Sequence, residues 1–160
     1  PAQLLENLSD RFELANVGDS SGYWESTHVG RGLSRLDWDG DGKLDFVVTH
    51  LGESSALLVN RTESKNNWIQ LRLRGVESER DAIGARIALS RGEVTDTRWV
   101  VSGDGFFSRN EAVVCFGLGD ATAVDEIRVT WPSGKSQVVA APSINQRYLV
   151  IENEIEPFSL

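Results

Sequence analysis

The chain has 160 residues, of which 40% are hydrophobic and 25% charged, so its composition is that of a globular protein and not of a disordered one. Its 16 lysines and arginines against 24 aspartates and glutamates give a net charge of −8, which argues against a general nucleic-acid binder, because that binding depends on clustered basic side chains. No apolar run approaches the roughly 18 residues of a membrane-spanning helix, so we expect no membrane insertion.

Apolar and polar residues alternate with a period of two in many short segments, whereas helical periodicity is scarce. The predicted strands are, in chain order, Phe46–His50, Ala56–Asn60, Trp68–Arg74, Ala85–Ser90, Thr97–Ser102, Ala112–Leu118, Glu126–Trp131, Ser136–Ala140 and Arg147–Glu152. The segment Pro132-Ser133-Gly134-Lys135 supplies a fixed φ and then a residue that tolerates a positive φ, which predicts a hairpin turn. We therefore predict a mainly β protein without a helix.

The composition changes at Arg61–Asn67, a segment with no apolar residue. After it come about seven strands over roughly 90 residues, which is typical of an antiparallel β-sandwich or jelly roll. Before it, Leu4–Ser9 resembles Leu57–Thr62, and internal repeats of roughly 40–50 residues indicate propeller blades. We expect a repeat region over 1–62 with a β-hairpin or partial blade, a sandwich over 63–154 and a tail over 155–160, and we expect the chain, which begins at Pro1, to be a fragment.

The strongest chemical signal is an acidic loop with the sequence Asp37-Trp38-Asp39-Gly40-Asp41-Gly42-Lys43-Leu44-Asp45. Four carboxylates stand at positions 1, 3, 5 and 9, and the two glycines let the backbone fold them inward. Like charges repel at this spacing, and a flexible ring of hard oxygen ligands suits Ca²⁺ better than Mg²⁺. The predicted calcium ligands are the side chains of Asp37, Asp39, Asp41 and Asp45 and the main-chain carbonyl of Lys43.

This loop is not an EF-hand, because Val48 stands at position 12, where the bidentate glutamate belongs, and a β run follows in place of a helix. A solvated turn rich in aspartate and glycine is the plainer interpretation of the same residues. If calcium does bind, the sequence favours a structural role in holding the loop over a catalytic one, and it leaves open whether the ion is also part of a binding site.

Several motifs together resemble two known families. The region from Gly30 through the acidic loop to Asn60 resembles the FG-GAP/VCBS repeat of integrin-type propellers. The rest resembles the ASPIC/UnbV domain in five pieces in the right order: Asn67-Trp68-Ile69, Arg80–Arg86, Gly103-Asp104-Gly105-Phe106, Phe116-Gly117-Leu118-Gly119 and Val129–Gly134. The resemblance implies a calcium-associated module that is secreted, periplasmic or on the cell surface, that binds an extracellular protein or glycan as adhesion modules do, and that is not an enzyme.

Two other functions remain open. A carbohydrate-binding sandwich would expose two or more Trp or Tyr rings on one flat or concave face. A hydrolase would need two carboxylates from the set Asp104, Glu111 and Asp120 within about 5–10 Å of one another in a cleft.

The remaining notable residues have plain structural interpretations. Trp68 and Trp131 lie in alternating strands and are expected in the core, and Cys115 is expected to be a small buried hydrophobe, whereas Trp38 and Trp99 stay open. In Arg80–Arg86 an Arg–Asp pair is expected to fix the start of a strand. The two histidines, His28 and His50, are not at metal-ligand spacing and are expected at the surface or at a strand end, and the triplets at Asn7 and Asn60 are interpreted as turn asparagines.

Overall fold

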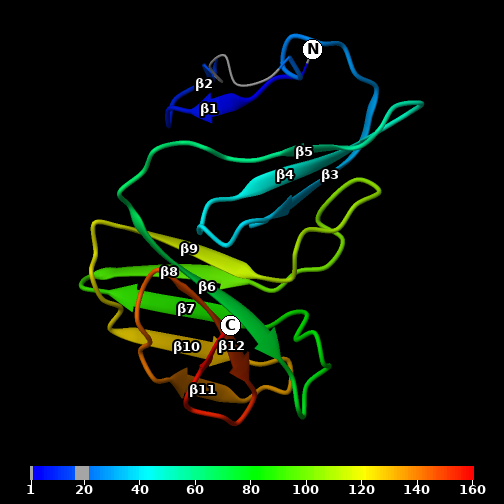
Figure 1. Cartoon of the computed structure of the whole chain (residues 1–160). Coiled ribbons are helices and arrows are strands. Elements are labelled where there is room, and N and C mark those ends of the chain that lie inside the picture. Colours follow the sequence, from blue (N-terminus) through cyan, green and yellow to red (C-terminus); the bar gives the residue numbers. More distant parts are fainter. Residues whose placement is uncertain (1, 17–21) are drawn as a thin grey trace.

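The computed structural model describes residues 2–16 and 22–160 (Figure 1). No helix occurs in these residues, and the strands form four sheets. The predicted mainly β class is therefore confirmed. In the described part, no helix is long and apolar enough to cross a membrane.

The structure has thirteen strands in its described residues. Their bounds are β1 (Leu5–Asn7), β2 (Phe12–Leu14), β3 (Gly30–Leu36), β4 (Asp45–His50), β5 (Ala56–Leu58), β6 (Asn67–Arg74), β7 (Arg86–Arg91), β8 (Val94–Trp99), β9 (Val114–Gly119), β10 (Glu126–Thr130), β11 (Ser136–Val139), β12 (Gln146–Ile151) and β13 (Phe158–Ser159). The predicted hairpin joins β10 to β11, with Gly134 at φ 88°, and is confirmed. Asn7 and Asn60 each accept a hydrogen bond from the backbone N–H two residues on, as turn asparagines do.

Two small antiparallel sheets form the first part of the chain. β1 pairs with β2, and β3, β4 and β5 form a three-stranded meander in that order. The alternation rule does not predict β3, because two glycines interrupt its pattern. At Gly32 an added Cβ would lie 3.3 Å from the carbonyl oxygen of Phe107, so the missing side chain lets a later loop pack directly on β3.

Two four-stranded sheets form the second part, with strand orders β11-β10-β7-β8 and β13-β12-β6-β9 (Figure 1). Their apolar residues share one buried cluster, which includes Ile69, Leu71, Ile87, Phe116 and Val129. Ile69, Leu71 and Leu73 share the buried face of β6, whereas Arg72 and Arg74 on the other face are exposed and Gln70 on that face is buried. The arrangement is consistent with a β-sandwich.

The expectation of a purely antiparallel sandwich is wrong for one pair. β12 runs parallel to β6, from Gln146 opposite Ile69 to Ile151 opposite Arg74. These two strands are separated by the whole of β7 to β11, so no hairpin fixes their relative direction. The strand expected at Thr97–Ser102 also lies earlier, at Val94–Trp99, because Gly92, at φ 55°, makes a two-residue turn directly after β7.

Two expectations about buried side chains are corrected in part. Trp131 belongs to the core, and its indole N–H donates to Gln137. Trp68 is only half-buried and lies outside the core cluster, because the acidic loop and not the opposite sheet covers it. Cys115 is also half-buried, and burial raises the pKa of its thiol to about 11, which keeps the thiol protonated at neutral pH.

Candidate metal centre and its surroundings

The acidic loop connects β3 to β4 and is held against the sandwich. Gly42 adopts a φ of 85°, and a Cβ at this residue would lie 2.0 Å from the ring of Trp68. Only glycine therefore fits between the loop and that indole. The glycine in the predicted motif thus has a packing role as well as a conformational one.

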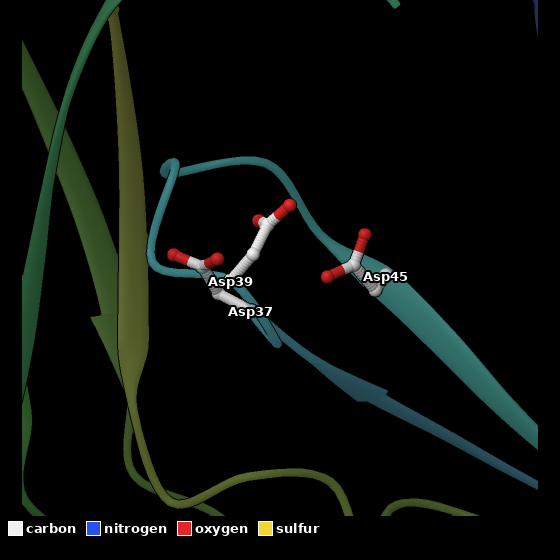
Figure 2. Close-up of side chains that lie close together, drawn as sticks. All are labelled: Asp37, Asp39 and Asp45. Atoms are coloured by element: carbon white, nitrogen blue, oxygen red, sulfur yellow. The ribbon is translucent and has the colours of Figure 1, made fainter. Parts of the chain in front are cut away.

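Three of the four predicted aspartates come together. Asp37, Asp39 and Asp45 each offer one carboxylate oxygen, and these three oxygens all lie within 4.8 Å of one another (Figure 2). Asp37 and Asp45 are buried, and Asp39 is exposed. Carboxylates this close repel one another, and a hard divalent cation between them would remove the repulsion.

The fourth aspartate, Asp41, faces Lys43 instead. Its Oδ2 lies 2.7 Å from the ammonium of Lys43, and its Oδ1 accepts the Lys43 backbone N–H at 2.9 Å. Partial burial opposes ionisation, but the hydrogen bonds and the charge of Lys43 outweigh it and hold the pKa of Asp41 below its ordinary value. The structure therefore does not place Asp41 in the metal-capable cluster.

Asp37 and Asp45 also shape the loop. Asp37 Oδ1 accepts the N–H groups of Gly40 and Asp41, and its Oδ2 accepts those of Gly42 and the Gln70 side chain. Asp45 accepts the N–H groups of Trp38 and Asn60. A carboxylate offers about four lone-pair sites, so Asp37 has little spare capacity. Asp39, which pairs with the exposed Arg61, has the most.

A polar network joins the loop to the sandwich. The Gln70 amide, which is buried in β6, donates to Asp37 at 2.8 Å and accepts from Arg147 at 2.8 Å. Arg147 in turn contacts the Glu111 carboxylate at 2.7 Å and lies 3.7 Å from Asp37. Buried polar groups need such partners, so this network fixes the loop relative to β6 and β12.

The second part of the chain carries a family signature. The family described as "ASPIC and UnbV" matches residues 75–157. The chain belongs to this family. It is also similar to Cartilage acidic protein 1 of Xenopus tropicalis, with 34% identity over 147 residues, which cover 88% of this chain and 22% of that protein. The Mus musculus protein of the same name is 37% identical over 141 residues, which cover 84% of this chain and 21% of the relative. The chain thus spans about a fifth of the length of these relatives.

One residue of the matched segment that the sequence does not single out is Glu152. Its buried carboxylate accepts three successive backbone N–H groups, those of Val76, Glu77 and Ser78, and the hydroxyls of Ser78 and Ser133. Burial opposes ionisation, but these five hydrogen bonds prevail and lower the pKa to about 2. Glu152 therefore ties the β6–β7 connection and the β10–β11 turn of the ASPIC/UnbV unit to the end of β12.

A second unexpected feature is a cluster of both histidines with Tyr23 and Glu53. His28 Nδ1 lies 2.8 Å from Glu53, His50 Nδ1 lies 2.8 Å from the Ser54 carbonyl, and the two rings are 5.0 Å apart. Because both partners are acceptors, each Nδ1 carries a proton, and a neutral His50 ring then accepts the Tyr23 hydroxyl at Nε2. His50 ends β4 as expected, whereas His28 is half-buried. The cluster fastens residues 23–28 to β4, and nothing in the spacing of the residues predicts it.

The Arg–Asp pair expected in Arg80–Arg86 forms with a different arginine. Asp81 lies 3.6 Å from Arg109, which comes from the long loop between β8 and β9. The pair therefore ties two loops together and does not fix the start of β7.

Proposed function

We propose that this chain is a non-enzymatic calcium-binding module in which Ca²⁺ orders the acidic loop. The observation that carries the proposal is the approach of Asp37, Asp39 and Asp45 oxygens to within 4.8 Å of one another. Carboxylate oxygens are the ligands that Ca²⁺ prefers, and the loop leaves Asp39 exposed for an ion to reach. In this proposal the ligand set is completed by the Lys43 carbonyl and by the Asp41 carboxylate, which gives up its ion pair with the Lys43 ammonium to bind the ion.

The proposal includes an architecture for the first part of the chain. We assign β3, β4 and β5 with the acidic loop to one FG-GAP/VCBS-like repeat of a propeller. The antiparallel meander in this order, with the aspartates between its first two strands, supports the assignment. The resemblance of Leu4–Ser9 to Leu57–Thr62 supports an adjacent repeat.

A binding role is favoured over catalysis by the state of the carboxylates. Asp104 and Glu111 line one cavity, as the hydrolase alternative requires. However, a hydrogen bond from Asn110, with the nearby Arg35, lowers the pKa of Asp104, and Arg147 pairs with Glu111. A general acid needs a raised pKa to hold its proton near neutrality, whereas the pKa of Asp104 is lowered.

Exposed aromatic side chains support a binding surface. Phe106 and Phe107 are 74% and 90% exposed, and they sit on a tight turn that is closed by the Gly105–Ser108 bridge and fastened to β3 by the Ser108 hydroxyl on the Leu33 carbonyl. Phe107 adopts a φ of 51°, which costs about 1–3 kcal/mol for such a residue. A fold that holds two apolar rings in water at this cost presents them to a partner, an extracellular protein or a glycan.

We place the module in a secreted, periplasmic or cell-surface protein. The relatives' name, Cartilage acidic protein 1, refers to cartilage, a tissue rich in extracellular matrix, which supports this location. Extracellular calcium sites have dissociation constants of about 10⁻⁴–10⁻³ M, which suits such surroundings.

The proposal is tested by the melting temperature of the Asp39→Asn variant. Calcium at a hundredfold excess over Kd should stabilise the wild-type chain by about 2.7 kcal/mol. Asp39→Asn should abolish this gain and leave the fold intact, because Asp39 is exposed and is not part of the loop's internal hydrogen bonds. The control Asp120→Asn, at another exposed aspartate, should keep the full gain. Equal calcium responses of the two variants would contradict the assignment.

A further inference from the structure

Strand β8 forms one edge of its sheet, and it approaches β9 at the edge of the other sheet. It is the last strand of its sheet, and its six residues pair with β7 without a bulge. Natural edge strands are commonly protected by proline, charged side chains or bulges. Val94–Trp99 has no proline, lysine or bulge, and its charged residues are Asp96, which pairs with Arg91, and Arg98. The opposite edge strand of the same sheet, β11, is shorter and follows directly after a lysine.

The hydrogen-bond register shows which backbone groups of β8 face outward. The Val100 N–H donates to the Ala85 carbonyl and the Val100 carbonyl accepts from Gly84, so the even-numbered residues from Val94 to Val100 bond toward β7. The N–H and C=O groups of Thr95, Thr97 and Trp99 therefore point away from the sheet. Among the described residues, no hydrogen bond engages them.

A cavity of about 380 Å³ adjoins the second half of this edge. It is lined by Thr97–Val101, by the start of β9 and by Arg35, Leu36 and Leu44 from the first part of the chain. Its volume falls within the range of about 300–1,000 Å³ found for ligand sites, which favour junctions between structural units. At its rim, Trp99 is 57% exposed, and such an indole can pack on an incoming apolar side chain.

One arginine that lines this cavity forms no ion pair with any described residue. Asp104 is held by Asn110 and Arg35, and Glu111 is held by Arg147. Arg98 lies 5.9 Å from the Phe116 ring and forms no ion pair with any described residue. An arginine without an ion pair beside this strand edge can bind a carboxylate of a partner, and that contact is local because the chain as a whole carries a net charge of −8.

We propose that β8 binds an extended segment of a partner protein by strand addition. The segment pairs with the outward groups of Thr95, Thr97 and Trp99, places an apolar side chain against Trp99 and brings a carboxylate to Arg98. Backbone pairing supplies affinity in this mode, and the flanking cavity and charge supply specificity. This inference rests on the proposed function only in taking the chain to be a binding module, since it does not use the calcium loop.

The test uses the full chain and a phage-displayed library of random twelve-residue peptides. We expect enriched peptides to combine β-branched or aromatic residues with Asp or Glu, and to slow hydrogen exchange at the Thr95, Thr97 and Trp99 amides. Thr97→Pro removes one outward donor without touching the β7 bonds and should weaken binding of the best peptide at least tenfold. Val138→Pro is the matched control, because the N–H of Val138 faces outward on β11, and it should leave binding unchanged.

Further arms separate the alternatives. A peptide methylated at alternate amide nitrogens cannot form the backbone hydrogen bonds and should lose binding to the wild-type protein. This experiment does not depend on whether Thr97→Pro folds. Arg98→Gln should weaken binding and reduce its salt dependence. Failure to enrich any peptide, or equal losses in Thr97→Pro and Val138→Pro, would overturn the proposal. Protection of the same amides that rises with protein concentration without peptide would overturn it in favour of a second copy. Peptide binding without calcium binding would refute only the proposed calcium site. Calcium binding without peptide binding would refute only this inference.

Discussion

The carboxylate of Glu152 provides the sharpest test of how the ASPIC/UnbV unit is held together. Glu152→Gln keeps the shape of the side chain and removes its charge. The wild-type carboxylate accepts three backbone N–H groups at 2.7–2.8 Å and two hydroxyls at 2.7 and 2.9 Å. Hydrogen bonds to charged groups contribute more than neutral ones, so the amide cannot replace this arrangement.

The magnitude follows from the pKa of Glu152. One pKa unit corresponds to about 1.4 kcal/mol, so a fall from 4.5 to about 2 is worth up to about 3 kcal/mol. We expect Glu152→Gln to lower the free energy of unfolding by about 2–3 kcal/mol at pH 7, which for a chain of this size lowers Tm by roughly 5–10 °C. The matched control is Glu154→Gln, an exposed glutamate two residues on, which should change little.

The pH dependence gives the result its specificity. The folded-state pKa lies below the unfolded-state value, so the stabilisation is complete above about pH 4.5 and is lost as the pH falls toward 2. Urea unfolding of wild type and Glu152→Gln at several pH values should therefore show a stability gap that closes over this window. A gap that stays constant down to pH 2, or a Glu154→Gln variant that loses as much as Glu152→Gln, would refute the reasoning.

Two further predictions concern the acidic loop and its contact with the sandwich. Gly42→Ala should destabilise the protein by about 1–3 kcal/mol more than Gly40→Ala in chemical denaturation, because both glycines have a positive φ but only at Gly42 would the new Cβ meet the Trp68 ring; equal losses would contradict the packing. A truncated chain that starts at Ser64 should give a β-type circular dichroism spectrum and a cooperative melt, with a lower Tm than the full chain because Gln70 and Arg147 lose Asp37; a disordered product would contradict the predicted domain boundary.

Local patterns predict much of this fold and miss specific parts for physical reasons. Alternation identifies β6 and β10 closely, and the Pro-Ser-Gly-Lys turn fixes the β10–β11 hairpin. Alternation does not identify β3, because its glycines let a distant loop pack on it. The parallel pairing of β6 with β12 depends on strands that lie far apart in the chain. Neither the packing partner nor the strand direction is encoded in a short window of residues.

In the candidate site, too, local sequence patterns predict some features, and contacts between residues far apart in the chain decide the others. The spacing of aspartates predicts that a cluster forms, and the structure brings together Asp37, Asp39 and Asp45. The departure of Asp41 comes from its neighbour Lys43, whose charge competes for the carboxylate. The Gln70 and Glu111 contacts of the loop, and the five donors around Glu152, come from residues remote in sequence, so only the folded chain reveals them.

Calorimetric titration of calcium into the chelator-treated full chain tests the central claim most directly. We predict one site per chain, with a dissociation constant of about 10⁻⁴–10⁻³ M. The binding heat should disappear in Asp39→Asn. No heat at calcium concentrations well above this range, together with an unchanged melting temperature, would contradict the account.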